Sequence, residues 1–514
     1  MNRFMKSALL LLLAAGVVGT TVPSFAAEYL VKYRNQAALQ MFSAGRQVQV
    51  LDVHDKGQLM KVEIADNKKV PAMVQLFSDP NIEYVVPNAK LHAFSAPVDM
   101  TALKDQWAIA KVQAEKAWAL AGNKGSKNVL VAVIDTGVDY KHKSLAPNMV
   151  PGYDFVQNDN DPMDVTGQNP GHGTHCAGIV GSTGLVDQGT TGLSPEVSIM
   201  PIRFLDQNGS GNLDNGIKAI DYAIEKGVQV ISASWGAAIP RDQAKPLIEA
   251  IARAEKAGVV FVVAASNDGK NNDSYEVYPA NAGLSNTISV AASNSSDGKP
   301  SWSNYGRKSV QLSSPGDGIM STLPKDKYGN LSGTSMATPL VAGLVAFLKA
   351  QDPKLTPMEL RSLMQSTGSK VGIETACDCR IDALSAVETI KSQKLFISPF
   401  AGAYAVGDNV QFEGVYGKGP YQFASSNASV ATIDASGMLT AVADGETQVS
   451  VTDAAGVTAT SYKIIVGKAS SGGTPPSDPS QPGQPGEGEC PIGDPQTCQA
   501  MCQIMPDLPW CNAN

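Results

Sequence analysis

Three short glycine-containing segments of the chain carry the side chains that nucleophilic catalysis requires. Ser335 lies in the segment GTSMATP, directly before an apolar run at 340–348 that has helical character. Asp135 follows the apolar run 131–134, and His172 lies in the segment GHGTH. A serine hydroxyl becomes a good nucleophile only when a base removes its proton, and that base needs an acid to hold its tautomer. The three segments therefore predict acyl-transfer chemistry.

Two of these side chains also have purely structural interpretations. Thr334 or Ser335 could simply cap the helix that follows, and Asp135 could cap the turn after its strand. Asp139 is the alternative carboxylate, but it lies beyond that turn. A helix cap would account for a hydroxyl at this position without accounting for the pattern around it, so we favour the catalytic interpretation.

The candidate bases are few, because the chain has only 5 histidines. His142, His172 and His175 are the ones that fall in the region between Asp135 and Ser335. His142 lies in a polar loop after the first strand and is expected at the surface. His172 and His175 share one glycine-rich helix start, and residue types alone do not separate them.

The elements around these residues alternate between strand and helix patterns over residues 95–392. Short apolar runs rich in Val and Ile suit strands that are buried on both faces of a parallel sheet, and they occur at 129–134, 229–233, 259–264 and 287–291. Between them, apolar residues recur at helical spacing in 213–226 and 246–256, before Gly227 and Gly258 respectively. The alternation predicts an α/β fold with a doubly wound, mainly parallel sheet. Reactive groups are expected at the carboxyl ends of its strands.

The three motifs and their order, Asp then His then Ser, resemble the subtilisin-like serine proteases. The resemblance covers residues 95–392 and the small unit before them. It implies a serine endopeptidase in which Ser335 is the nucleophile, His172 is the general base, Asp135 orients the base, and His175 is structural.

The same resemblance predicts an oxyanion hole. Asn267, in the segment AASNDG, is similar to the family's oxyanion-hole asparagine, although Ser266 stands where glycine is usual. Its amide is expected to donate to the tetrahedral intermediate beside the backbone N–H of Ser335.

The N-terminal 94 residues are predicted to be removed in two steps. Residues 1–26 have basic residues, an apolar run at 8–19 and a small-x-small site, which is typical of a secretory signal peptide. Residues 27–94 resemble the small α+β propeptide of the same family, which implies autocleavage between Phe94 and Ser95. The alternative is a lasting N-terminal accessory domain.

The primary specificity pocket is predicted from Ser234, Trp235 and Gly236, which resemble the strand that pairs with the substrate backbone. Two indications conflict. Cleavage after Phe94 implies a pocket for a large apolar residue, whereas Val277 stands where relatives often carry glycine and should shorten it. We expect medium or large apolar residues.

The C-terminal region changes character. Residues 395–467 show short alternating strands with Gly and Asn turns and resemble a bacterial Ig-like module, a small β-sandwich expected to bind a surface or polymer. Residues 468–489 are rich in Ser, Gly and Pro and are predicted to be a linker. Residues 490–514 form a cysteine-rich tail.

The 7 cysteines suit an oxidising compartment. Cys377 and Cys379 are predicted to pair with each other or with partners elsewhere, and two disulfides are expected among Cys490, Cys498, Cys502 and Cys511. Cys176 is left over beside His175. A buried free cysteine is the favoured interpretation, with a catalytic thiol as the alternative.

No cofactor is required for the chemistry. Relatives that bind calcium tightly carry an aspartate where 142–145 reads HKSL, so calcium is not expected at that first site, and the loop 181–192 does not match the usual calcium loop. The acidic stretch 154–164 could bind a hard cation through oxygens, or it could be a solvated loop.

These features predict a secreted enzyme, extracellular or periplasmic, with protein or peptide substrates and its own propeptide as inhibitor. A net charge of -8 argues against a nucleic-acid partner, and no later apolar run is long enough to span a membrane. Two alternatives are an exported binding protein with an inactive core, and an esterase or transpeptidase using the same triad.

Overall fold

The computed structural model describes residues 27–35, 48–65, 68–94, 106–184, 190–467 and Cys502. The predicted signal peptide, the linker 468–489, Ser95, and the tail cysteines Cys490, Cys498 and Cys511 lie outside the described residues; Cys502 is disulfide-bonded. The chain divides into two units, Met1–Pro87 with Gly483–Asn514, and Asn88–Pro482.

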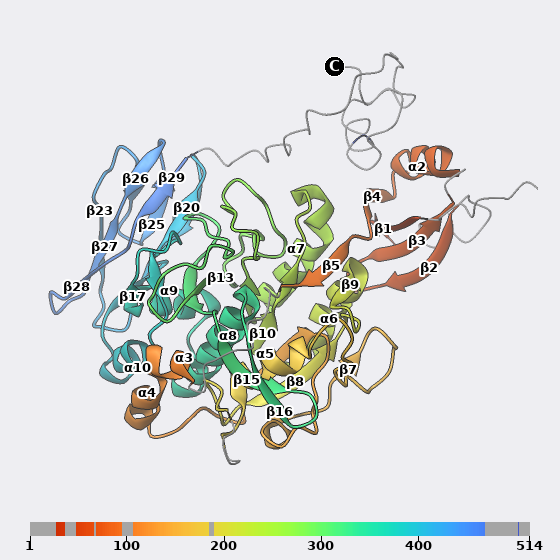
Figure 1. The fold of residues 1–514 in the computed structure, drawn as a ribbon. Helices are drawn as coiled ribbons and strands as arrows, with labels where there is room; N and C mark the ends of the chain where they lie inside the picture. The colour runs from red at the N-terminus through yellow and green to blue at the C-terminus, as the bar shows by residue number, and fades with distance from the viewer. Residues whose placement is uncertain are drawn as a thin grey trace, which may run out of the picture. The chain divides into compact units, whose positions relative to one another are not determined.

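In its described residues, the first unit is a four-stranded antiparallel sheet in the order β2-β3-β1-β4 with one helix (Figure 1). Its elements are β1 (Ala27–Tyr33), β2 (Gln49–His54), β3 (Leu59–Ile64), α2 (Lys69–Phe77) and β4 (Ile82–Pro87). Ala72, Met73 and Leu76 of α2 share a core with the buried residues of β1 and β3. The small α+β architecture matches the prediction, although β2 was not recognised in the sequence.

The second unit is built on a nine-stranded sheet in the order β17-β18-β14-β13-β12-β10-β6-β8-β7, parallel except for β17. Its strands are β6 (Leu130–Asp135), β7 (Tyr153–Asp154), β8 (Ser198–Arg203), β10 (Val230–Ala233), β12 (Val260–Ala264), β13 (Thr287–Ser293), β14 (Leu312–Pro315), β17 (Ser369–Lys370) and β18 (Cys379–Arg380). The order in which strands are added to the sheet reverses at β6, because β8 lies on one side of it and β10 on the other. The prediction of a doubly wound sheet is confirmed, and its reversal point is where such folds place their reactive groups.

Helices cover both faces of this sheet (Figure 1). They are α3 (Trp107–Lys111), α4 (Ala114–Ala121), α5 (His172–Gly181), α6 (Leu213–Glu225), α7 (Arg241–Lys256), α8 (Thr334–Gln351), α9 (Pro357–Thr367) and α10 (Ala383–Ser392). Val131 and Val133 share a core with α8. Ala132 and Ile134, which alternate with them along β6, are buried outside that core. Burial on both faces explains why these strands are continuously apolar rather than alternating. No helix in the described part of the chain is both long enough and apolar enough to cross a membrane.

The two predicted helices end where their glycines indicated. Gly227 and Gly258 follow α6 and α7 with φ values of 71° and 73°, a conformation that glycine adopts without steric cost. Helix α7 begins earlier than the predicted residue 246, because Pro246 is accommodated inside the helix and its first turn is polar.

The C-terminal strand-rich region is the Ig-like module. Its strands are β19 (Phe396–Ser398), β20 (Gly402–Tyr404), β21 (Asn409–Gln411), β22 (Glu413–Val415), β23 (Gln422–Ser425), β24 (Ala431–Ile433), β25 (Met438–Ala441), β26 (Gly445–Thr447), β27 (Val449–Thr452), β28 (Thr458–Thr460) and β29 (Ile464–Val466). Its buried residues Phe396 and Ile397 belong to the same core as Leu360 and Leu363 of α9. The module is therefore packed directly onto the α/β part of its unit.

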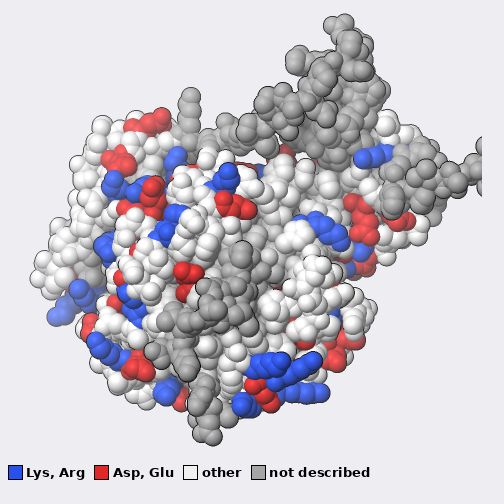
Figure 2. Space-filling view, in the orientation of Figure 1, with Lys and Arg blue, Asp and Glu red and all other residues white. Residues whose placement is uncertain are grey.

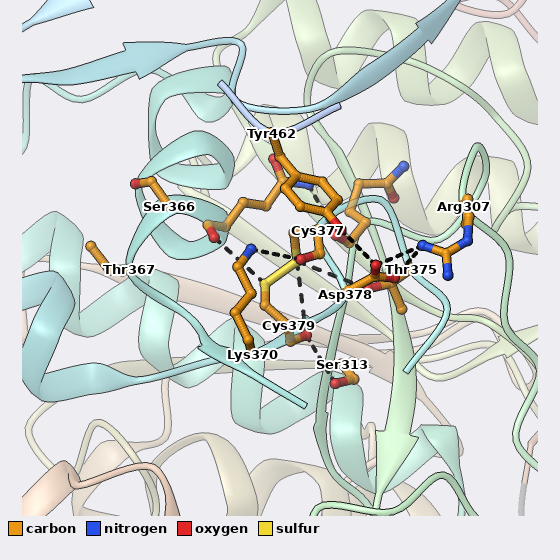
Figure 3. Close-up of a disulfide and its surroundings, with 12 residues drawn as sticks. Arg307, Ser313, Ser366, Thr367, Lys370, Thr375, Cys377, Asp378, Cys379 and Tyr462 are labelled. Atoms are coloured by element: carbon orange, nitrogen blue, oxygen red, sulfur yellow. Dashed lines mark hydrogen bonds and ion pairs between the residues drawn. A yellow bond between two sulfur atoms is a disulfide. The ribbon is translucent and has the colours of Figure 1, made fainter. Parts of the chain in front are cut away.

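A disulfide lies at this junction (Figure 3). Cys377 and Cys379 are bonded to each other, and the residue between them, Asp378, has a φ of 49°. Its carboxylate accepts hydrogen bonds from Arg307, at 2.6 Å, and from the Tyr462 hydroxyl of the Ig-like module, at 2.7 Å. Burial would raise the pKa of Asp378, but the hydrogen bonds from Arg307 and Tyr462 outweigh it and lower that pKa. The disulfide therefore brackets Asp378, whose carboxylate joins Arg307 of the α/β part to Tyr462 of the Ig-like module.

Replacing Asp378 with asparagine is expected to loosen this junction. The change removes a charge-assisted pair, and because Arg307 is 41% exposed we expect a loss of about 1 kcal/mol in the free energy of unfolding, or about 2–4 °C in Tm. The measurement is thermal unfolding beside Glu374→Gln, which removes the exposed carboxylate 3.8 Å from the same guanidinium. Equal Tm values for the two variants would contradict a joining role for Asp378.

Candidate active site

Three elements bring Asp135, His172 and Ser335 together. Asp135 is the last residue of β6, His172 is the first of α5, and Ser335 is the second of α8. His172 Nδ1 lies 2.7 Å from Asp135 Oδ1, and both side chains are 1% exposed. The same carboxylate oxygen accepts the backbone N–H of Thr136 at 2.8 Å. Asp135 therefore fixes which nitrogen of His172 carries the proton and leaves Nε2 as the basic one.

The bond between base and nucleophile is not formed in this structure. Ser335 Oγ donates to the carbonyl of Ser234 at 3.0 Å, and His172 Nε2 has no hydrogen-bond partner among the described residues. The lack of a serine–histidine hydrogen bond in an unreacted site does not exclude the pair, because such bonds often form or tighten only when substrate is bound. Rotation of the Ser335 side chain is the movement that the chemistry requires.

The electrostatics of His172 suit a base. Burial disfavours the imidazolium, but the adjacent Asp135 carboxylate outweighs burial and raises the pKa of His172 well above its usual 6.5. A raised pKa means that the neutral ring takes up a proton readily, and the resulting cation is stabilised where it forms.

Asn267 presents an unused donor at the same site. Its Oδ1 accepts both the backbone N–H and the hydroxyl of Thr334, each at 2.9 Å, which fixes the orientation of the amide. Its Nδ2 is buried and, within the described residues, has no partner. Ser266 adopts a φ of 91°, which explains why glycine is usual there, and its hydroxyl donates to Asp268 at 2.7 Å.

The structure separates the alternatives to these residues. The expectation that His142 lies at the surface is wrong: it is fully buried, and its Nε2 lies 3.1 Å from the carbonyl of Lys327. His175 is also buried, which lowers its pKa to about 3, so its ring is neutral at neutral pH. Asp139 accepts the backbone N–H groups of Lys141 and Lys325 rather than a histidine proton.

Cys176 is a buried free thiol, as expected. Its sulfur lies 3.9 Å from His172 Nδ1 and donates to the backbone carbonyl of Ser335 at 3.4 Å. Burial raises the pKa of the thiol, so the thiolate that nucleophilic attack requires is disfavoured. Cys176 packs beneath the site.

Residues 88–94 lie in a cleft beside these groups. Strand β5 (Lys90–Ala93) is the centre of an antiparallel three-stranded sheet between β11 (Trp235–Gly236) and β9 (Ser210–Asn212). The backbone N–H of Phe94 donates to the Ser234 carbonyl at 3.1 Å, the same oxygen that accepts from Ser335. An extended segment that adds a strand to a sheet edge is a common way of binding peptides.

The aromatic ring of Phe94 lies against Gly236. A Cβ at that glycine would come within 2.8 Å of the ring. The Phe94 ring therefore fits here because residue 236 has no side chain. Phe94, Gly236 and Asn267 border a cavity of about 510 Å³. Tyr278 pairs with Ala237 across a backbone bridge, and Val277 is buried beside it.

The same segment also caps α6, a contact that the sequence did not reveal. Asn88 accepts the backbone N–H of Asp214 at 3.1 Å and donates to its carboxylate at 3.0 Å, while the carbonyl of Ala89 accepts from Leu213 at 2.9 Å. The helix's own N-cap residue, Asn212, makes no side-chain capping bond. An acidic residue in the first turn of α6 was the only signal available, and it does not identify a partner 126 residues away.

Metal ligation is not indicated by this geometry. Within the described residues, the one group of three His, Cys, Asp or Glu side chains close enough to hold an ion is Asp135, His172 and Cys176, which belong to the site just described. In the acidic stretch 154–164, Asp154 is paired with Arg203 at 2.7 Å. The expectations about calcium stay predictions.

A buried aspartate–histidine pair, a serine at a helix start and a fixed amide donor at the edge of a parallel sheet define a serine hydrolase. The chain belongs to the subtilase family, which matches residues 126–384, and the intimin immunoglobulin-like domain matches residues 407–455. It is therefore a serine endopeptidase that hydrolyses peptide bonds.

Three relatives illustrate the similarity. The chain is 38% identical to Thermitase of Thermoactinomyces vulgaris over 52% of this chain and 89% of that protein. It is 36% identical to a Thermophilic serine proteinase of Bacillus sp. (strain AK1), over 67% of this chain and 82% of that one. The Major intracellular serine protease of Bacillus subtilis (strain 168) is 38% identical over 47% of this chain and 74% of its own length.

Proposed function

We propose that this chain is a secreted endopeptidase that works through an acyl-enzyme and matures by cutting its own propeptide. The observation that carries the catalytic assignment is the 2.7 Å contact between Asp135 and His172, with His172 Nε2 unpartnered within the described residues. The Cys176 sulfur contacts both His172 Nδ1 and the Ser335 carbonyl, which brings the two segments together.

In this mechanism Ser335 Oγ leaves the Ser234 carbonyl, gives its proton to His172 Nε2 and attacks the substrate carbonyl. The developing oxyanion accepts from Asn267 Nδ2 and from the backbone N–H of Ser335 at the start of α8. His172 then donates its proton to the leaving amine, which departs as the acyl-enzyme forms. A water, deprotonated by the same histidine, attacks the ester and regenerates the serine.

The segment 88–94 supports the maturation step. Phe94 directly follows the added strand β5, and its N–H donates to the Ser234 carbonyl, which also accepts from Ser335. This is the arrangement of a substrate residue just before the cleaved bond, or of a product that has not left. Removal of residues up to Phe94 would empty the cleft, and before removal those residues would exclude other substrates.

Figure 2 shows lysine and arginine side chains interspersed with aspartate and glutamate on the visible face of the molecule. We therefore propose that substrates are chosen by shape and apolar contact at the Gly236 pocket rather than by net charge. Binding of a surface or polymer by the Ig-like module stays a prediction.

The experiment that tests the catalytic assignment is the pH dependence of kcat/KM on a neutral peptide amide that carries phenylalanine before the cleaved bond. His172 acts as a base only when neutral, and Asp135 raises its pKa, so activity should rise with pH through an apparent pKa above 6.5. A substrate without titrating groups and a check of protein stability across the range serve as controls. An acid limb at or below pH 6 would contradict the role of His172.

A further inference from the structure

A second buried carboxylate, Asp164, lies behind the Asp135–His172 pair. It is 6% exposed and comes from the loop between β7 and α5. Its Oδ1 accepts the hydroxyl of Thr136 at 3.0 Å, and its Oδ2 accepts the backbone N–H of Thr174 at 3.0 Å and the hydroxyl of the same residue at 2.6 Å. The mechanism above does not use Asp164.

The two threonine hydroxyls join the segments that carry the pair. Thr136 follows Asp135, and its Oγ1 accepts the backbone N–H of Gly173, the residue after His172, at 2.9 Å. Thr174 Oγ1 accepts the backbone N–H of Asp139 at 2.9 Å. A hydroxyl has a single proton and two acceptor lone pairs, so giving that proton to Asp164 sets the rotation of each threonine hydroxyl and leaves its lone pairs for these N–H groups.

Asp164 also reaches the start of α5 through Asn169. The side-chain oxygen of Asn169 accepts the backbone N–H groups of Gly171 at 3.1 Å and His172 at 2.7 Å, and its amide lies 3.5 Å from Asp164 Oδ1. One carboxylate therefore fixes the acceptors around both residues of the pair.

The charge of Asp164 is expected to be present when the enzyme works. Burial raises its pKa to about 6, while hydrogen bonds from Thr174 and Thr136 oppose that rise and Asp135 adds to it. The titratable groups on the neighbouring elements are Asp135 and Asp139, at and after the end of β6, and His172, His175 and Cys176 on α5. Above pH 6 the carboxylate is ionised, and its negative charge favours the imidazolium form of His172.

We propose that Asp164 is a positioning residue for peptide hydrolysis: it locks the hydroxyls of Thr136 and Thr174 so that β6 and α5 hold Asp135 and His172 in catalytic register. This inference rests on the proposed triad. It assigns a function to a buried carboxylate that otherwise would only cost free energy to bury.

Asp164→Asn tests the proposal because it keeps the shape and removes one acceptor. Whichever way the amide lies, its NH2 group replaces one carboxylate oxygen and faces either the Thr136 hydroxyl or the backbone N–H and hydroxyl of Thr174, so one threonine loses its acceptor and its hydroxyl proton must turn away from residue 164. A misplacement of the pair by a fraction of an ångström should lower kcat about 10- to 100-fold. KM should stay within about twofold, because the substrate strands β9 and β11 are untouched.

Three readouts separate positioning from general damage. The matched control is Asp159→Asn, an exposed carboxylate of the same loop, which should leave kcat unchanged. Thr136→Val should reproduce the loss while Thr136→Ser restores activity, which keeps the proposal testable if Asp164→Asn does not fold. The acid limb of kcat should move to lower pH in Asp164→Asn, because a charge that favours the imidazolium is gone.

Some outcomes would overturn the proposal. If kcat in Asp164→Asn stays within twofold of the native value, or falls only in proportion to the folded fraction with an unmoved acid limb, Asp164 is not a positioning residue. Equal activity of Thr136→Val and the native protein would also overturn the positioning role of Asp164. An inactive native protein, or a Ser335→Ala variant that keeps activity, would instead contradict the proposed triad itself.

Discussion

Replacing Ser335 with alanine is expected to abolish peptide hydrolysis and to leave the propeptide attached. In subtilisin, the reference case for this magnitude, loss of the nucleophile lowers kcat about 10⁶-fold. The same size of effect is expected here, because without Ser335 Oγ no acyl-enzyme can form. His172 and Asn267 would remain in place around an empty position.

The measurement combines a kinetic assay with intact mass and N-terminal sequencing of the exported protein. The native chain should begin at Ser95, and Ser335→Ala should retain residues from about 27 onward. Ser301→Ala, a change at an exposed serine of the same unit, is the control and should behave like the native chain. If the native protein and Ser335→Ala were processed identically, another protease would be responsible and the self-cleavage step would be wrong.

The second large effect is expected at Asn267. Removing one oxyanion donor costs about 10²–10³ in kcat, a magnitude that again comes from subtilisin. We expect Asn267→Ala to show this loss with little change in KM, because the amide contacts the oxyanion only as the tetrahedral intermediate forms. The assay is steady-state hydrolysis of the neutral peptide amide.

A second variant separates the donor from the structural role of the same side chain. Asn267 Oδ1 accepts from Thr334 at the start of α8, and Asn267→Asp keeps that acceptor while removing the N–H donor. We therefore expect kcat to fall in both variants, whereas the Tm of Asn267→Asp should equal that of the native protein. Full activity in Asn267→Asp would show that Asn267 supports α8 rather than the oxyanion.

Much of the α/β core could be predicted because its strands are buried on both faces. Continuous apolar runs such as 259–264 leave few alternatives to a parallel strand, and Gly227 and Gly258 mark helix ends through their backbone freedom. The assignment of Ser335, His172 and Asp135 depended on motif and order instead, since residue types alone left His175 open.

Features that depend on tertiary contacts could not be predicted. His142 has lysines on both sides and was expected at the surface, yet Tyr328 of β16 (Lys327–Leu331) packs edge-on against its ring at 5.1 Å. Asn88 gives no local sign that it caps a helix 126 residues later. Asp164 looks like one more acidic residue in a polar loop, and only its contacts with Thr136 and Thr174 distinguish it from Asp159.

The central claim is that Ser335 is a nucleophile activated by His172, and covalent labelling tests it most directly. The native mature protein would be treated with a fluorophosphonate, which phosphonylates an activated serine with loss of fluoride, and the modified peptide would be identified by mass spectrometry. We predict one adduct, on Ser335, formed in step with the loss of activity and absent in His172→Ala from which the native enzyme has first removed the propeptide. An active preparation that carries no adduct on Ser335, or that is labelled equally well without His172, would contradict the account.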